Sequence, residues 1–109
     1  MSDETTEAHL QELRRGTVVL ACLLKLRRPD YGYALLVSLA ADGFNVDANT
    51  LYPLLRRLEK QQLLASEWNT DEARPRKFYR TSPAGSELAA TLTATWGALT
   101  ESLTRLKES

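Results

Sequence analysis

Polar and apolar positions in the first long segment follow the period of an α-helix. Apolar or small side chains recur at intervals typical of one helical face, and these are Leu10, Leu13, Thr17, Leu20, Ala21 and Leu24. Val18, Val19 and Leu23 widen the face, so its later part is expected to be almost fully buried. The pattern predicts a helix over residues 7–26.

A second, shorter helix is predicted over residues 31–43, in the stretch YGYALLVSLAADG. Pro29 ends the helix before it, because proline lacks the amide proton that a helix interior needs. Asp30 can cap the start of the second helix, and Gly43 suits the left-handed position that follows a helix end.

A third helix lies within NTLYPLLRRLEK, and the pattern leaves two starts open. Asp47 can serve as its cap, which places Pro53 late in the helix. A start at Asn49 places Pro53 more comfortably, nearer the first turn.

The next two segments, LLASEWN and KFYRTS, hold aromatic and β-compatible residues and flank the polar stretch TDEARPR. They predict a β-hairpin with a long tip. Ser82 followed by Pro83 is a cap and first-turn pair, so a final helix is expected over residues 83–107. Three helices and a hairpin describe a mainly α, α+β fold, a winged helix-turn-helix over residues 1–82, with a C-terminal dimerisation helix over 83–109 in the same compact unit.

The third helix has one apolar and one basic side. At about 100° per residue, its leucines gather in one arc, while the opposite arc holds Asn49, Pro53, Arg56 and Lys60, flanked by Tyr52 and Arg57. A helix with ordinary charged residues facing solvent is the alternative interpretation, but such a face usually mixes both signs of charge, whereas three bases gather here. The hairpin tip adds Arg74, Arg76 and Lys77, which favours a double-helical polyanion.

Composition sharpens this picture. Basic and acidic residues number 14 each, so the net charge is zero. The charges are unevenly distributed, because residues 52–80 contain seven basic and four acidic side chains, whereas residues 1–12 contain acidic side chains and no lysine or arginine. Within the basic region, arginine and asparagine can grip base edges, so Asn49 and Arg56 are candidates for base contacts and the lysines for phosphate contacts. Spacing alone leaves these roles open.

Several classes of function are disfavoured. A single cysteine, Cys22, and a single histidine, His9, exclude a disulfide within the chain and a Cys/His metal site, and no cofactor is expected. Cys22 in an apolar run is expected to be a buried, inert thiol rather than a redox sensor. Nucleophile motifs and glycine-rich phosphate loops are absent from the sequence, which argues against an enzyme. The longest apolar run is too short for a membrane span, so a cytoplasmic protein is expected.

Three stretches carry a family resemblance: YGYALL, NTLYPLLRRLEKQQLLASEW and RPRKFYRTSPAGSELAATLTATW. Over residues 13–96 the chain resembles PadR-family bacterial transcriptional regulators, in the branch with one short C-terminal helix. The resemblance implies a winged-helix dimer that represses transcription and leaves its DNA when a small effector binds. It also implies DNA contacts by Tyr33, Thr50, Tyr52, Arg56, Arg74, Arg76 and Lys77.

The chain departs from the family pattern at two positions. Tyr31 stands where the family often has histidine, which puts one backbone contact in doubt. Gln62 replaces a glycine before the first wing strand, which implies a different helix ending.

The last predicted helix has a narrow apolar seam: Leu88, Leu92, Trp96, Leu99, Leu103 and Leu106. Packing against a second copy, together with Leu10 and Leu13 of the first helix, would cover it and place two recognition helices in major grooves about 34 Å apart on a palindromic operator. Trp96 is first of all dimer core, with Trp96 and Leu92 as alternative contacts to a small hydrophobic or aromatic effector. The main rival function is a winged helix that docks proteins without reading DNA.

Overall fold

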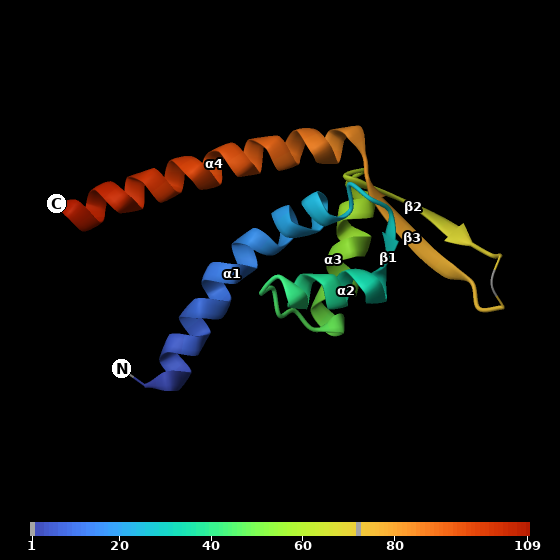
Figure 1. Ribbon diagram of the computed structural model, residues 1–109, viewed down its shortest axis with the longest axis horizontal. Coiled ribbons are helices and arrows are strands. Elements are labelled where there is room, and N and C mark those ends of the chain that lie inside the picture. The colour runs from blue at the N-terminus through green and yellow to red at the C-terminus, as the bar shows by residue number, and fades with distance from the viewer. Residues whose placement is uncertain (1, 72) are drawn as a thin grey trace.

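The computed structural model describes residues 2–71 and 73–109. Along the chain these residues form α1 (Asp3–Lys25), β1 (Asp30–Tyr31), α2 (Gly32–Ala41), α3 (Ala48–Lys60), β2 (Leu64–Asn69), β3 (Arg76–Thr81) and α4 (Pro83–Glu108). The mainly α winged-helix fold expected from the sequence is confirmed (Figure 1).

Helix α1 begins earlier than the apolar pattern predicts. The Ser2 side chain accepts a hydrogen bond from the Thr5 amide at 3.2 Å, and Asp3 and Glu4 occupy the first turn. Acidic side chains there interact favourably with the positive end of the helix dipole. The predicted start at residue 7 was wrong because it followed burial, whereas local capping sets this end of the helix.

The two inner helices begin differently. Asp47 caps α3, since its carboxylate accepts a hydrogen bond from the Thr50 amide at 2.8 Å, which settles the open choice of start. The predicted cap of α2 was wrong, because the residue in the cap position is Tyr31 and Asp30 lies in strand β1. The Asp30 carboxylate instead accepts from the adjacent Tyr31 amide at 2.9 Å.

Helix α3 ends in a turn that normally uses glycine. The amide of Leu63 donates to the carbonyl of Leu58, and the amide of Gln62 donates to that of Glu59, both at 2.9 Å. This double hydrogen bond is a Schellman motif, and it puts the residue after the cap in the left-handed region. Gln62 has φ 64°, so the chain keeps the usual helix ending although glycine is absent.

The sheet has three antiparallel strands in the order β1-β3-β2. The hairpin of β2 and β3 was predicted, and its register pairs Leu64 with Thr81 and Trp68 with Lys77. Strand β1 was not predicted. Two residues show no alternation, and Tyr31 becomes a strand residue only through its pairing with Phe78 of β3.

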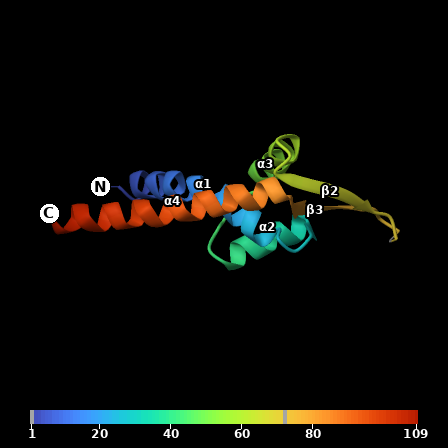
Figure 2. The same cartoon turned by 90° about the horizontal axis from the view of Figure 1, so that it is seen from above.

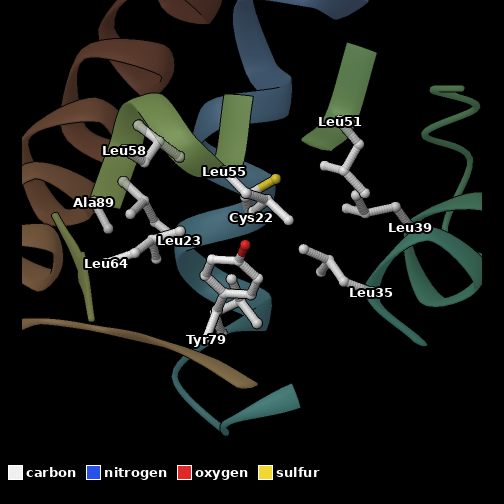
Figure 3. Close-up of a cluster of buried hydrophobic side chains, with 11 residues drawn as sticks. Cys22, Leu23, Leu35, Leu39, Leu51, Leu55, Leu58, Leu64, Tyr79 and Ala89 are labelled. Atoms are coloured by element: carbon white, nitrogen blue, oxygen red, sulfur yellow. The ribbon is translucent and has the colours of Figure 1, made fainter. Parts of the chain in front are cut away.

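The hydrophobic core lies where α1, α2, α3, the sheet and the start of α4 meet (Figure 3). Leu51, Leu55 and Leu58 of α3 are buried in it. Cys22 is also buried, and burial raises the pKa of its thiol to about 12. The thiol is therefore protonated and inert near neutral pH, as predicted.

The ends of three helices are joined at one point. Thr81, at the end of β3, donates its amide to the Leu26 carbonyl at 2.8 Å and its hydroxyl to the Leu23 carbonyl at 2.7 Å. Ser82, the cap of α4, donates its hydroxyl to the Gln62 carbonyl at 2.7 Å. Gly85 packs so closely that an added Cβ would lie 2.1 Å from the Leu63 carbonyl oxygen.

Beyond this junction α1 and α4 extend away from the body, on the side opposite to the hairpin (Figures 1 and 2). The radius of gyration is 16.2 Å, whereas a compact chain of this length has about 13 Å. The ends of α1 and α4 that extend beyond the body (Figure 1) contribute to this difference.

Candidate nucleic-acid interface

The outer face of α3 is exposed because its inner face is pinned by three buried leucines. The predicted DNA-contact residues of this helix that are exposed are Asn49, Thr50, Pro53, Arg56, Arg57 and Lys60. Asn49, Pro53, Arg56 and Lys60 share one arc, as predicted, because they lie within about 60° of one another around the helix axis. The structure therefore presents a continuous polar and basic ridge, here called the α3 ridge.

Tyr52 lies at the edge of this ridge and has a packing role. An added Cβ at Gly32 would lie 2.4 Å from a carbon of the Tyr52 ring. The ring therefore covers the start of α2 and is only partly exposed. Tyr33, one residue further along α2, is 63% exposed and is available for contact with a partner.

The hairpin presents its basic residues in different ways. Arg74 is exposed in the tip between β2 and β3. The guanidinium of Arg76 lies over the Tyr31 ring, 4.4 Å from its centroid, and that ring meets Phe78 edge-on at 5.5 Å. Tyr31, the residue that departs from the family pattern, thus supports the wing from β1.

Arg76 and Lys77 are not in the hairpin tip, where the sequence placed them, because β3 begins at Arg76. Lys77 contacts α3 instead. It lies in β3, and its ammonium donates to a Glu59 carboxylate oxygen at 2.9 Å. The hydroxyl of Ser66 in β2 donates to the other oxygen of the same carboxylate. Accepting these two hydrogen bonds lowers the pKa of Glu59, and donating to Glu59 raises the pKa of Lys77. Glu59 therefore connects the recognition helix to both wing strands.

Glu59 was not predicted to be a site residue. Its only sequence signal was its position at the flank of the basic arc, between the buried and exposed sides of α3. The strand register decides which side chains face Glu59, because it places Ser66 and Lys77 on the same face of the sheet. That register could not be read from the hairpin sequence with its long tip.

The residues predicted for dimerisation fall into two groups. The exposed group lies on the protruding parts of the helices and comprises Leu13, Trp96, Leu99, Leu103 and Leu106. Leu88 and Leu92 instead pack against the core of their own chain, and Leu10 is half-buried. Large apolar side chains thus follow α4 beyond the point where this chain covers it.

A groove of about 690 Å³ runs between α1, α4 and the loop after α2. Leu20, Leu24, Phe44 and Trp96 supply its apolar lining, and an ion pair of Lys25 with Asp42 lies at its rim. Trp96 is 56% exposed. Leu92, the other residue predicted to contact an effector, does not line this groove.

A family model described as the transcriptional regulator PadR-like family matches residues 19–91. The chain belongs to the PadR family. The match begins within α1 and ends within α4, so it includes α3, the hairpin and the junction with α4. PadR proteins are DNA-binding transcriptional regulators, and the resemblance found in the sequence is confirmed.

Individual relatives agree with this family. Transcriptional regulator Rv3488 of Mycobacterium tuberculosis is 42% identical over 77 residues, which cover 70% of this chain and 72% of that protein. A PadR-family transcriptional regulator from Eggerthella lenta is 48% identical, with a TM-score of 0.94 over 98% of this chain and 96% of the other. A PadR-like regulator from Bacillus cereus has a TM-score of 0.80 at 25% identity, over 90% of this chain and 98% of the other.

In this PadR protein the α3 ridge lies next to the wing, because Glu59 of α3 accepts hydrogen bonds from both wing strands. Among residues 2–71 and 73–109, none of the helices has the length and apolar character needed to cross a bilayer.

Proposed function

We propose that this PadR protein is a dimeric repressor that binds a palindromic operator and releases it when a small hydrophobic or aromatic effector binds. The observation that carries the proposal is the α3 ridge, on which Arg56, Arg57 and Lys60 are exposed while the leucines of the same helix are buried. A helix fixed in this way can present side chains to a major groove without rearranging.

Contacts to the duplex divide by chemistry. Arg56 and Asn49 are suited to paired hydrogen bonds with guanine and adenine edges, respectively. Lys60 and Arg57 are suited to phosphates, and Arg74 at the wing tip can reach the backbone or the adjacent minor groove. We leave Lys77 out of this set, because Glu59 holds its ammonium.

The dimer is supported by the unpartnered part of α4. Leu99, Leu103 and Leu106 are each more than half exposed, which is unfavourable for a soluble single chain at about 25 cal/mol per Å² of apolar surface. Burying this stripe against a second copy would relate the two α3 ridges by a twofold axis. A palindromic site is the matching DNA symmetry.

Effector binding is supported by the groove beside Trp96. Its lining combines an exposed indole with aliphatic side chains of α1, which suits a flat apolar molecule. The groove touches both protruding helices, so a ligand that changes the angle between them would change the spacing of the recognition helices in a dimer.

The test is a titration of the purified protein with the DNA upstream of its own gene at several salt concentrations. Arg56→Ala is expected to weaken binding by about 1–3 kcal/mol if it reads a base, or to flatten the log-log salt slope by about 0.9 if it holds a phosphate. Arg105→Ala is the matched control, because Arg105 lies in the last turn of α4. Equal affinity and slope in the wild type and in Arg56→Ala would contradict the proposed surface.

Effector release has its own test. Trp96→Phe leaves Trp68 as the remaining tryptophan, so the emission lost in this variant belongs to Trp96. Planar hydrophobic compounds are expected to change that emission and to lower DNA affinity. A panel that changes emission equally in the wild type and in Trp96→Phe would argue against the groove.

A further inference from the structure

Glu59 occupies the boundary between the recognition helix and the wing. Its two carboxylate oxygens accept from different strands, one from Ser66 in β2 and the other from Lys77 in β3. Side chains 59 and 77 are about equally accessible, at 31% and 29%. The pair therefore lies at the surface of the molecule, on the side where the wing meets α3.

Lys77 is held by more than its ion pair. Its ammonium also lies 5.2 Å from the centroid of the Tyr79 ring, and Tyr79 is buried in the core. Both partners direct the lysine toward its own protein. A lysine near a phosphate-binding surface would otherwise add one counterion-releasing contact that is independent of DNA sequence.

Glu59 is also close to the ridge that the DNA would meet. Arg56 and Lys60 are three and one positions away on the same helix, which places them about 60° and 100° around the axis from Glu59. An acid at this position repels phosphate and lowers the local positive potential. These two effects of the Glu59 carboxylate depend on its staying between the α3 ridge and the wing.

We propose that Glu59 is a positioning residue, which keeps Lys77 away from DNA phosphates and fixes the wing on the recognition helix. The inference rests on the proposed DNA-binding function. It assigns Lys77 a role within the protein, in contrast to the DNA contact that the family resemblance implies. By removing a sequence-independent contact, Glu59 lowers the affinity for random DNA and for the operator by similar factors and reduces the salt dependence of both.

The experiment measures salt-dependent binding to a random duplex and to the upstream DNA. Glu59→Gln removes the negative charge that attracts Lys77 and leaves one acceptor oxygen for two donors, so Lys77 is freed for phosphate contact and the log-log salt slope on random DNA is expected to steepen by about 0.9. The affinities for upstream and for random DNA should rise by similar factors. Lys77→Gln alone should leave the slope unchanged, and Glu59→Gln combined with Lys77→Gln should restore the wild-type slope.

Glu67→Gln is the matched control. Glu67 is exposed on β2 and pairs with Phe78, so its side chain lies on the sheet face opposite to Ser66 and Lys77. Like Glu59→Gln, this substitution removes one negative charge, but it does so on the wing and releases no lysine. Thermal unfolding of each variant checks that the fold is retained.

Three results would overturn the inference. Equal slopes in Glu59→Gln and Glu67→Gln would mean that charge alone matters, and a slope flattened by Lys77→Gln alone would mean that Lys77 already contacts phosphate. A steeper slope that persists in the double variant would exclude Lys77 as its source. If Arg56→Ala still weakens binding in these cases, the proposed function stands and only the role of Glu59 fails. Absence of duplex binding by the wild type overturns both.

Discussion

The winged body and the protruding helices are built from similar leucine-rich helices but differ in how those leucines are used. Leu51, Leu55 and Leu58 of α3 are at most 1% exposed. Leu99 and Leu103 of α4 are 58% and 59% exposed. The body is completed by its own chain, whereas the protruding part of α4 has an apolar stripe with no cover.

This difference separates two sources of stability. Burial of apolar surface stabilises the body whatever the protein concentration. The protruding helices can gain the same stabilisation only from another molecule, so their contribution should depend on concentration. Substitutions in the two regions should therefore give effects of different kinds as well as different sizes.

The largest effect is expected from Leu99→Asp. In a dimer two unpaired carboxylates would be buried, at a cost of several kcal/mol for each, so the variant should be monomeric and should lose operator binding. Light scattering gives the mass and a gel-shift titration gives the affinity. Ala94→Asp is the control, since residue 94 is exposed and lies about 140° from residue 99 around the helix. A wild-type monomer would contradict the dimer.

The next effect is in the body. Leu55→Ala leaves a cavity in the core and should lower the free energy of unfolding by about 2–5 kcal/mol. Leu103→Ala, made in the monomeric Leu99→Asp background, should change it by less than about 0.5 kcal/mol because it removes no buried contact. Urea unfolding of both variants in that background checks the contrast, and equal losses would mean that α4 is covered within its own chain.

A smaller change is expected at the junction where the two regions meet. Gly85→Ala puts a methyl group against the Leu63 carbonyl and should cost about 1–3 kcal/mol through overpacking. Gly97→Ala is a control of opposite sign: its added Cβ has nothing within 4 Å, and alanine favours a helix over glycine by about 0.5–1 kcal/mol. Thermal unfolding should therefore shift in opposite directions, and a shared direction would contradict the tight junction.

The smallest effect is expected at the end of α3. Gln62→Gly should stabilise the fold by about 1 kcal/mol, because glycine adopts the left-handed conformation without the Cβ strain that glutamine bears there. Gln61→Gly should destabilise it, since residue 61 has φ −79° and glycine only adds freedom to the unfolded chain. Chemical denaturation can resolve both changes, and destabilisation by Gln62→Gly would show that its side chain has a separate role.

The sequence could predict features that depend on local pattern. The caps at Asp47 and Ser82, the left-handed Gly43, the hairpin and the basic arc of α3 each depend on residues close in the chain, and the structure contains all of them. The start of α1 at Asp3 was missed, although Ser2 as a cap and the acids Asp3 and Glu4 in the first turn indicate a helix start there. That error came from following burial when capping was the better guide.

Features that depend on distant pairing could not be predicted. Strand β1 exists because Tyr31 meets Phe78, and Lys77 is paired within the protein because the register of β3 turns it toward Glu59. Neither relation has a periodic signal in the sequence. The same holds for Tyr52, whose ring was assigned to DNA and which covers Gly32 in the structure.

The start of α4 is held at the junction, so a rotation there displaces the far end of the helix much more than its start. A helix of 26 residues is about 39 Å long, so a rotation of roughly 5° at Ser82 displaces its free end by about 3 Å. Conversely, a small displacement of the free C-terminal end of α4 rotates its start at Ser82 only slightly. Because the end of α3 is hydrogen-bonded to the start of α4, α3 should move much less than the free end of α4.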